Sequence, residues 1–193
     1  MKTWKVKKSE VLHSNPFFNL KKDIVEDFDG QEQTYWYTQE TDGVMIVPIT
    51  IKDEKITYTM VNQYRHPTSA MQLEFPKGAL EKGESKEAGA KRELFEETGL
   101  KATWTKFMYI FSPSVGRSTC HVSVYLALVE GEPTNENAEL SELGGGLEVV
   151  KVDADELLKK VQNNEIRDSH TLAALAAVML QSDEAKRYIE GVN

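Results

Sequence analysis

The sequence holds a single cysteine, Cys120, in a chain of 193 residues. The chain can therefore form no internal disulfide and offers no multi-cysteine metal site. Cys120 stands in the alternating segment STCHVSVYLA, so we interpret it as an inert thiol buried on a strand rather than as a nucleophile. No run of 18 apolar residues occurs, and we expect no helix that spans a membrane.

Positive charge is also scarce, because 23 lysines and arginines stand against 31 aspartates and glutamates, a formal net charge of −8. Nucleic-acid binding needs a basic surface, so we expect no nucleic-acid partner. The N-terminal segment MKTWKVKKSEV has basic residues but lacks the apolar block of a secretory signal, and we expect a cytoplasmic protein. An acidic protein can still act on an anionic substrate if a bound cation supplies positive charge locally.

Strand patterns dominate the first half of the chain. Strands are predicted at 3–14, twice within 18–40 around the turn DFDGQ, twice within 43–65 around KDEK, and at 71–75. Pro48 lies inside one of these strands, and proline there predicts a sheet edge or a bulge.

Helix signals begin after the strands. A helix is predicted directly after Ser85, a suitable N-cap, and Gly99 can supply its left-handed C-terminal cap. Gly89 inside this helix costs about 0.5–1 kcal/mol relative to alanine. Further strands are predicted at 103–111, 120–130 and 147–152, and further helices at 153–164, with Asp153 as N-cap, and at 168–182. This order favours an α+β fold, an α/β/α sandwich around a mixed sheet, preceded by an N-terminal antiparallel β-region.

Residues 78–100, GALEKGESKEAGAKRELFEETGL, hold six glutamates in 23 residues. On a helix Glu93, Glu96 and Glu97 stand at i, i+3 and i+4, so they share one face within roughly 100°. Like charges at that spacing repel. Arg92 can offset one of these repulsive pairs, by pairing with Glu96 four positions further on. The segment is either a solvated charged helix or a site for a hard divalent cation such as Mg²⁺, which prefers oxygen ligands.

The same segment resembles the box of the Nudix family: G, five residues, E, seven residues, R-E, an aliphatic, any residue, E-E, any residue, G, an aliphatic. Every fixed position is filled, by Gly78, Glu84, Arg92, Glu93, Leu94, Glu96, Glu97, Gly99 and Leu100. The resemblance implies an α/β/α sandwich that hydrolyses a nucleoside diphosphate linked to another moiety. It favours the cation site over the solvated helix.

The resemblance also implies roles for residues of the box. The metal ligands that it implies are the carboxylates of Glu93, Glu96 and Glu97, the accessory acid Glu84 and the backbone carbonyl of Lys77. Arg92 would orient the carboxylates, and Glu93 and Glu97 would be central to catalysis. Bound Mg²⁺ or Mn²⁺ would neutralise the diphosphate and lower the pKa of a water molecule, whose proton a glutamate would take.

The residues before the box are similar to those of the ADP-ribose pyrophosphatase and nucleoside diphosphate sugar hydrolase branch. That branch often reads Q-[YF]-R, a spacer and E-[FL]-P-A-G, which Gln63, Tyr64, Arg65, Glu74, Phe75, Pro76 and Gly78 match, with Lys77 in place of the alanine. Arg65 would contact the diphosphate or the terminal ribose, or else is a strand-edge arginine. Glu74 would either bind substrate or brace the loop.

A second branch motif lies beyond the box. Pro113 resembles the proline that marks the branch, but Ser114 and Val115 separate it from Gly116. No acidic residue follows Gly116 directly, where the branch often has one, and this departure loosens the assignment to ADP-ribose in particular.

In this branch the general base commonly comes from a loop far beyond the box. The loop NENAELSELGGG offers Glu139 and Glu142 as candidates, with Glu136 behind them. The alternative is a solvated acidic loop without a catalytic role.

Members of the branch are commonly dimers with N-terminal β-regions that are packed or exchanged across the two-fold axis. We therefore expect a homodimer, with residues 1–42 for dimerisation and substrate and residues 43–193 as the catalytic domain. Tyr35 and Trp36 could stack on a nucleobase, although strand alternation places them on opposite faces. The alternative for both is a place in the core.

Three functions remain under consideration. The first is metal-dependent hydrolysis of nucleoside diphosphate sugars such as ADP-ribose or GDP-mannose. The second is a Nudix hydrolase of nucleoside triphosphates or dinucleoside polyphosphates, which the QYR and EFPKG segments disfavour. The third is a nucleotide-sensing module, which usually lacks box carboxylates that this chain retains.

Overall fold

The computed structural model describes residues 2–134 and 146–181. The chain forms two compact units. One comprises Met1–Asp42 and Ser112–Val122, and the other comprises Gly43–Phe111 and Ser123–Asn193.

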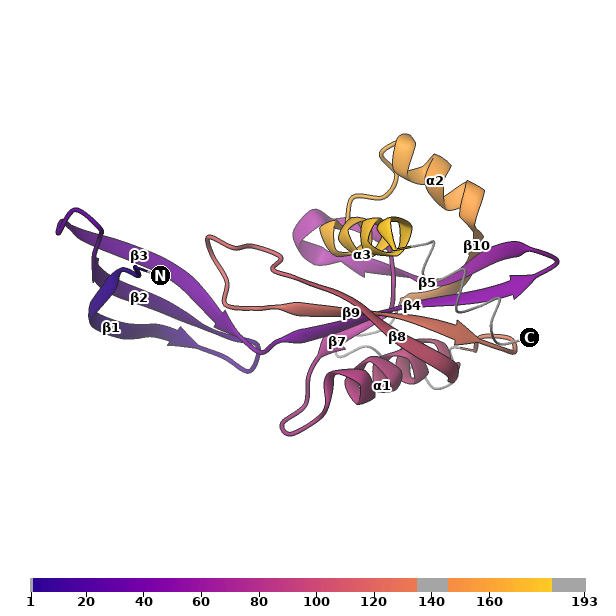
Figure 1. The fold of residues 1–193 in the computed structure, drawn as a ribbon, viewed down its shortest axis with the longest axis horizontal. Coiled ribbons are helices and arrows are strands. Elements are labelled where there is room, and N and C mark those ends of the chain that lie inside the picture. Colours follow the sequence, from indigo (N-terminus) through magenta and orange to yellow (C-terminus); the bar gives the residue numbers. More distant parts are fainter. Residues whose placement is uncertain (1, 135–145, 182–193) are drawn as a thin grey trace. The chain divides into compact units, whose positions relative to one another are not determined.

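The first unit is an antiparallel sheet of three strands in the order β1-β2-β3 (Figure 1). Its strands are β1 (Lys5–Ser14), β2 (Phe18–Glu26) and β3 (Glu32–Glu40). Gly30 adopts a φ of 77° in the predicted turn between β2 and β3, a conformation that favours glycine. The second part of this unit, Ser112–Val122, joins the sheet along β3, because the Thr38 N–H donates to the Arg117 carbonyl at 2.7 Å. Cys120 lies in that segment, outside any strand, and is half-buried rather than buried as expected.

The second unit is built on a seven-stranded sheet in the order β10-β5-β4-β9-β8, with β6 paired to β5 and β7 paired to β4. Its strands are β4 (Gly43–Lys52), β5 (Lys55–Arg65), β6 (Ala70–Glu74), β7 (Lys77–Ala79), β8 (Ala102–Phe111), β9 (Val122–Val129) and β10 (Leu147–Asp153). Its helices are α1 (Lys86–Thr98), α2 (Ala154–Gln162) and α3 (Ser169–Leu180), with a 3₁₀ turn at His66–Thr68.

Helices cover both faces of this sheet. Helix α1 lies on one face, and α3 and α2 lie on the other (Figure 1). The predicted α/β/α sandwich is therefore confirmed, as is the N-terminal antiparallel β-region. None of the helices in the described ranges is long and apolar enough to cross a membrane.

Of the two places predicted for Pro48, a sheet edge or a bulge, the edge is wrong, because β4 is a central strand. On one side β4 pairs first with β7, up to Met45, and then with β5, from Ile49 onwards. Ile46 donates its N–H to the Pro76 carbonyl on that side, and residues two apart in a strand point the same way. The position without an N–H therefore falls in the gap between two partner strands, where no ladder bond is lost.

In two of these three helices the side chain at the N-cap position caps the helix. Ser85 caps α1 by accepting from the Ala88 N–H at 3.2 Å, and Gly99 ends the helix with a φ of 70°. Asp153 holds the N-cap position of α2 as predicted, but its side chain accepts from the Thr57 hydroxyl at 3.0 Å and makes no cap bond. Asp168, which the sequence analysis did not single out, caps α3.

The apolar core between α1 and the sheet fixes the helix that carries the box. Its buried members are Val44, Ile46, Ala90, Leu94, Leu100, Tyr125, Ala127 and Val129. Leu94 and Ala90 lie on the side of α1 that faces the sheet. Glu93, next to Leu94, is thereby held at the margin of this core rather than in open solvent.

Candidate active site

The guanidinium of Arg92 is the centre of the box. Its Nε and Nη2 donate to Glu84 at 3.0 and 3.1 Å, and its Nη1 donates to Glu93 at 2.7 Å and to Glu96 at 2.8 Å. Nη2 also donates to the Ala79 carbonyl at 2.9 Å. The rigid fork of an arginine can hold three carboxylates in a fixed arrangement, which a single ammonium point charge cannot. The Arg92–Glu96 pair that helical spacing predicts is thus one of several.

The carboxylates around Arg92 differ in their environment. Glu93 is buried, and burial raises its pKa, although the hydrogen bond and charge of Arg92 oppose this. Hydrogen bonds from Arg92 hold the pKa of Glu84 below its usual value. Glu96 is exposed. The helix therefore presents one carboxylate toward the protein interior and another toward solvent.

Two glycines make room for this arrangement. A Cβ atom at Gly78 would overlap the carboxylate of Glu93, so a larger residue there would displace this carboxylate. A Cβ atom at Gly89 would come within 2.8 Å of Glu84 Oε2 and 2.9 Å of Leu80 Cδ2. The helix-weakening glycine therefore has a packing reason, since the loop before α1 closes onto the helix at this point.

Glu97 has the most perturbed carboxylate of the box. Its Oε2 atom is buried and has no hydrogen-bond partner within the described parts of the chain. Burial and the neighbouring charge of Glu93 raise the pKa of Glu97 to about 8, against the opposing effects of Lys77 and Arg65. The backbone N–H of Lys77 lies near the Glu97 carboxylate and, like the Lys77 ammonium, lowers its pKa. A buried carboxylate oxygen without a donor is costly unless another positive partner meets it.

This donor set fits a divalent cation. Hard cations such as Mg²⁺ take carboxylate and carbonyl oxygens, and the enclosed Oε2 of Glu97 beside Glu93 offers such an oxygen without a donor. In the described ranges no three acidic, histidine or cysteine side chains form a ready-made cage. In this structure Arg92 donates hydrogen bonds to the carboxylates of Glu84, Glu93 and Glu96.

Arg65 and Glu74 face each other directly. Arg65 donates to both Glu74 oxygens, from Nε at 3.0 Å and from Nη2 at 2.5 Å. Lys77 Nζ forms a further ion pair with Glu74, which is only 2% exposed. Of the two roles considered for Glu74, this geometry favours bracing the loop. Two of the Arg65 nitrogens donate to Glu74.

Asp168 joins this network from α3 and was missed in the sequence. Its Oδ2 lies 3.4 Å from Lys77 Nζ and accepts from the Thr171 N–H at 3.0 Å and its hydroxyl at 2.8 Å. His170 Nδ1 lies 3.3 Å from Asp168 Oδ1. An aspartate before a helical stretch signals an N-cap, which would have found Asp168 as a cap but not as a partner of Lys77.

Tyr35 and Trp36 lie on β3 of the first unit and are both exposed. The Tyr35 hydroxyl donates to the Gly116 carbonyl at 2.9 Å, and its ring packs edge-on against Trp4. Lys22 Nζ lies 5.5 Å from the centre of the Trp36 ring. Their exposure argues against the core alternative, and strand alternation means that one base cannot stack on both from one face. Glu136, Glu139 and Glu142 lie outside the described residues.

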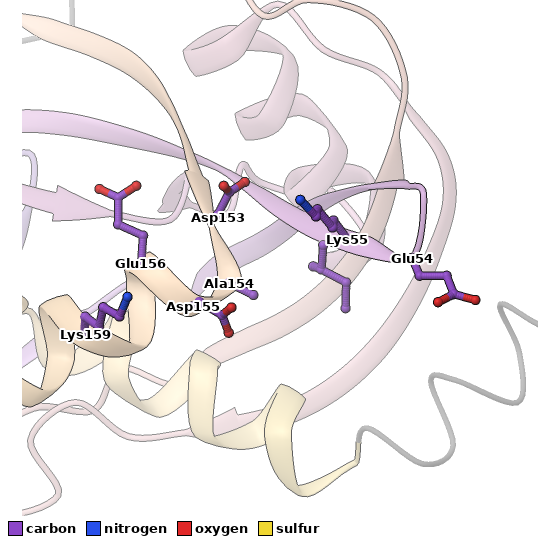
Figure 2. A pocket seen from close by; sticks show the side chains of 8 residues that line it. Glu54, Lys55, Asp153, Ala154, Asp155, Glu156 and Lys159 are labelled. Atoms are coloured by element: carbon purple, nitrogen blue, oxygen red, sulfur yellow. The ribbon is translucent and has the colours of Figure 1, made fainter.

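A pocket of about 460 Å³ lies elsewhere in the second unit, at the start of α2. Figure 2 shows its charged lining, which comprises Glu54, Lys55, Ile56, Asp153, Ala154, Asp155, Glu156 and Lys159. No residue of the box contributes to it. Its lining has four carboxylates and two lysines, and the described residues give it neither the buried carboxylates nor the central arginine of the box.

Comparison with known proteins gives concordant matches. The model of the NUDIX domain matches residues 39–175. The methanol dehydrogenase activator of Bacillus methanolicus is 32% identical over 174 residues, 90% of this chain and 91% of the relative. The ADP-ribose pyrophosphatase of Bacillus subtilis (strain 168) is 32% identical over 172 residues, 89% of this chain and 90% of the relative.

A solved structure described as an ADP compounds hydrolase superposes with a TM-score of 0.76 and 18% identity, covering 100% of this chain and 97% of that one. This likeness shows the shared fold. Together with the complete box, the family match over residues 39–175 and the relatives at 32% identity establish that the chain belongs to the Nudix hydrolase family.

Proposed function

We propose that the chain catalyses metal-dependent hydrolysis of the pyrophosphate bond in nucleoside diphosphate sugars, with ADP-ribose and GDP-mannose as candidate substrates. The observation that carries the proposal is the enclosed Oε2 of Glu97, which meets no donor among the described residues and lies beside the buried carboxylate of Glu93. The pyrophosphatase activity in the name of the Bacillus subtilis relative supports the substrate class.

In this proposal the residues of the box hold Mg²⁺ or Mn²⁺. The ligands would be Glu93 and Glu97, with Glu96, Glu84 and the carbonyl of Lys77 completing the set. Such a cation, when bound, neutralises the diphosphate and acidifies a water molecule. Arg92 keeps Glu84, Glu93 and Glu96 in place through the hydrogen bonds that it donates to each of them.

The reaction adds water across a P–O–P linkage. The water oxygen bonds to one phosphorus, the bridging P–O bond breaks, and the bridging oxygen leaves with the second phosphate. A glutamate removes the proton of the water. We assign this role to Glu139 or Glu142. The products are a nucleoside monophosphate and a sugar phosphate.

We also propose that Arg65 contacts the substrate and that Glu74 sets its orientation. The bidentate ion pair between them presents the guanidinium in one fixed rotamer, which lowers the entropic cost of binding an anionic group. Tyr35 and Trp36 are proposed to contact the base or sugar, since both rings are exposed.

The N-terminal β-region, residues 1–42, is proposed to form a homodimer contact, with residues 43–193 as the catalytic domain. Every residue of β1 is exposed, including Val6 at 56% and Val11 at 54%. Three strands that bury so little apolar surface need a further covering surface for stability. A cytoplasmic location without nucleic-acid or membrane partners completes the proposal.

The test is product release from a substrate panel with and without Mg²⁺. The panel contains ADP-ribose, ADP-glucose, GDP-mannose, UDP-glucose, ATP, GTP and diadenosine polyphosphates. Metal-dependent release of AMP, GMP or UMP from the diphosphate sugars would support the proposal. Cleavage restricted to triphosphates or dinucleoside polyphosphates would replace it with the second function. Tight binding of one compound without turnover of any would favour a sensor.

A further inference from the structure

We propose that Lys77 and Asp168 form a positioning pair that fixes the strand segment on which the carboxylates of the box depend. The pair connects α3, on one face of the sheet, to the segment directly before the box, which pairs with β4 and contacts α1 on the opposite face. This inference rests on the proposed function, because it assigns to α3 a part in shaping that same site.

Lys77 lies between the two helical layers. Side chains alternate along a strand, and the open side of Gly78 faces Glu93 of α1, so the Lys77 side chain points to the opposite face. There its Nζ forms ion pairs with Glu74 and, at 3.4 Å, with Asp168. The backbone N–H of the same lysine lies near the Glu97 carboxylate and lowers its pKa, and the next residue, Gly78, lies against the Glu93 carboxylate. A movement of Lys77 therefore shifts a contact of Glu97 and the strand that passes Glu93.

Asp168 is a rigid anchor for this ammonium. Its Oδ2 receives the backbone N–H and the hydroxyl of Thr171, which is fully buried. Burial raises the pKa of Asp168, but His170, Lys77 and Thr171 together hold it well below its usual range. The Thr171 hydroxyl also lies 3.4 Å from the Phe75 N–H, so a second link joins α3 to the same segment.

The fold does not depend on this pair alone. Without Lys77, Glu74 keeps both hydrogen bonds from Arg65. Without the charge of Asp168, Lys77 keeps Glu74. Without Lys77, Asp168 keeps the hydrogen bonds from the Thr171 N–H and hydroxyl and lies 3.3 Å from His170 Nδ1. Each single change thus leaves the remaining carboxylates hydrogen-bonded, which limits the destabilisation that an isolated buried charge would cause. The expected effect is local loosening of residues 75–78 rather than unfolding.

The experiment compares full-length Lys77→Met, Asp168→Asn and the double variant with wild type. Lys151→Met is the matched control. Lys151 lies on β10 and forms an ion pair with Glu132 at 2.7 Å. Three quantities are measured: hydrogen exchange of the peptide spanning 74–79 without metal, the affinity for Mn²⁺ alone by electron paramagnetic resonance, and kcat and KM for ADP-ribose.

If the two residues acted through their charges alone, the two single variants would change the Mn²⁺ affinity in opposite directions. Removing the positive charge of Lys77 would tighten Mn²⁺ binding, and removing the negative charge of Asp168 would weaken it. Loss of positioning weakens Mn²⁺ binding in both, by about tenfold, and lowers kcat by about tenfold with little change in KM. Exchange of the 74–79 peptide becomes about tenfold faster in both. The double variant resembles each single variant, and Lys151→Met behaves as wild type.

Opposite changes in Mn²⁺ affinity, multiplicative effects in the double variant, or unchanged exchange at 74–79 would each overturn the proposal. These outcomes are separable from failure of the proposed function. If wild type cleaves no diphosphate sugar, the exchange and Mn²⁺ measurements still decide whether the pair positions the segment. If wild type binds no Mn²⁺, the metal site itself is refuted, while exchange still tests the link.

Discussion

Gly78 lies so close to Glu93 that the carboxylate of Glu93 leaves no room for a Cβ atom at position 78. The carboxylate of Glu93 fills the volume where any Cβ at position 78 would lie. The glycine of the box is thus needed for a close approach of strand to helix, and its backbone conformation is not of the left-handed kind. The approach places a buried carboxylate against the segment that also contacts Glu97.

Gly78→Ala should displace the Glu93 carboxylate. Because misplacement of a reacting group by about 1 Å can cost about 100-fold in rate, we expect kcat to fall by at least about tenfold. Steady-state kinetics on ADP-ribose measures this. Gly116→Ala is the control, since its Cβ would meet only the Tyr35 hydroxyl at 3.7 Å, an ordinary contact. Equal kcat in the two variants would contradict the steric role of Gly78.

Glu97→Gln keeps the shape of the side chain and removes the negative charge. If Glu97 is a metal ligand, the rate should fall by about 100-fold or more while the fold remains intact. Kinetics at saturating Mg²⁺ and thermal unfolding give the two readouts. Glu132→Gln serves as the control, because Glu132 is exposed and pairs with Lys151. Retained activity would remove Glu97 from the metal site.

The raised pKa of Glu97 predicts a pH dependence of stability in the metal-free protein. The ordinary pKa is 4.5 and the folded value is about 8, so the folded state binds this proton more tightly. The stabilisation is fully present below pH 4.5 and is lost as the pH rises to about 8. At about 1.4 kcal/mol for each unit of pKa, wild type should therefore lose about 5 kcal/mol of folding stability relative to Glu97→Gln across this range. Urea unfolding at several pH values measures the free energy of unfolding of both proteins. If it changed with pH in the same way in wild type and in Glu97→Gln, the raised pKa of Glu97 would be refuted.

Mn²⁺ should reverse this loss in wild type, because the cation binds the deprotonated carboxylate and displaces its proton. The stabilisation by a fixed concentration of Mn²⁺ should consequently increase between pH 6 and about pH 8, the pKa of Glu97. Thermal unfolding with Mn²⁺ and with a chelator is the measurement. A gain that is independent of pH would mean that the cation binds elsewhere.

Arg92→Lys should not be tolerated, because an ammonium cannot reproduce the fork that reaches Glu84, Glu93 and Glu96 together. We expect kcat to fall about 10–100-fold, as for other groups that orient metal ligands. Arg167→Lys is the matched control, since Arg167 is exposed and makes one hydrogen bond, to the Asn164 carbonyl at 3.2 Å. Equal rates for the two variants would show that positive charge alone suffices at position 92.

The exposed strand β1 predicts a dimer. Gel filtration with light scattering at micromolar concentration should give twice the chain mass of 21.8 kDa. Val11→Asp should shift the protein toward the monomer, because it places a charge on the apolar surface of β1. Glu10→Lys is the control, because Glu10 lies on the opposite face of the same strand and pairs across from Lys22. A wild-type mass near that of one chain would end the dimer proposal.

Local signals in the sequence determined where the elements of the site begin and end. Ser85 and Gly99 mark the ends of α1 because capping depends on residues a few positions away. The spacing of Glu93, Glu96 and Glu97 settled their common face for the same reason, since a helix has one period. The complete box then identified the family without any structure.

Only the tertiary structure decided which contacts these residues make across the chain. Asp168 meets Lys77 from 91 positions away, and Pro48 is tolerated in a central strand because β4 changes partners beside it. The enclosed oxygen of Glu97 is likewise invisible to periodicity. The physical reason is that capping and helical spacing are short-range, whereas burial, charge pairing and the space left for a glycine depend on how distant segments pack.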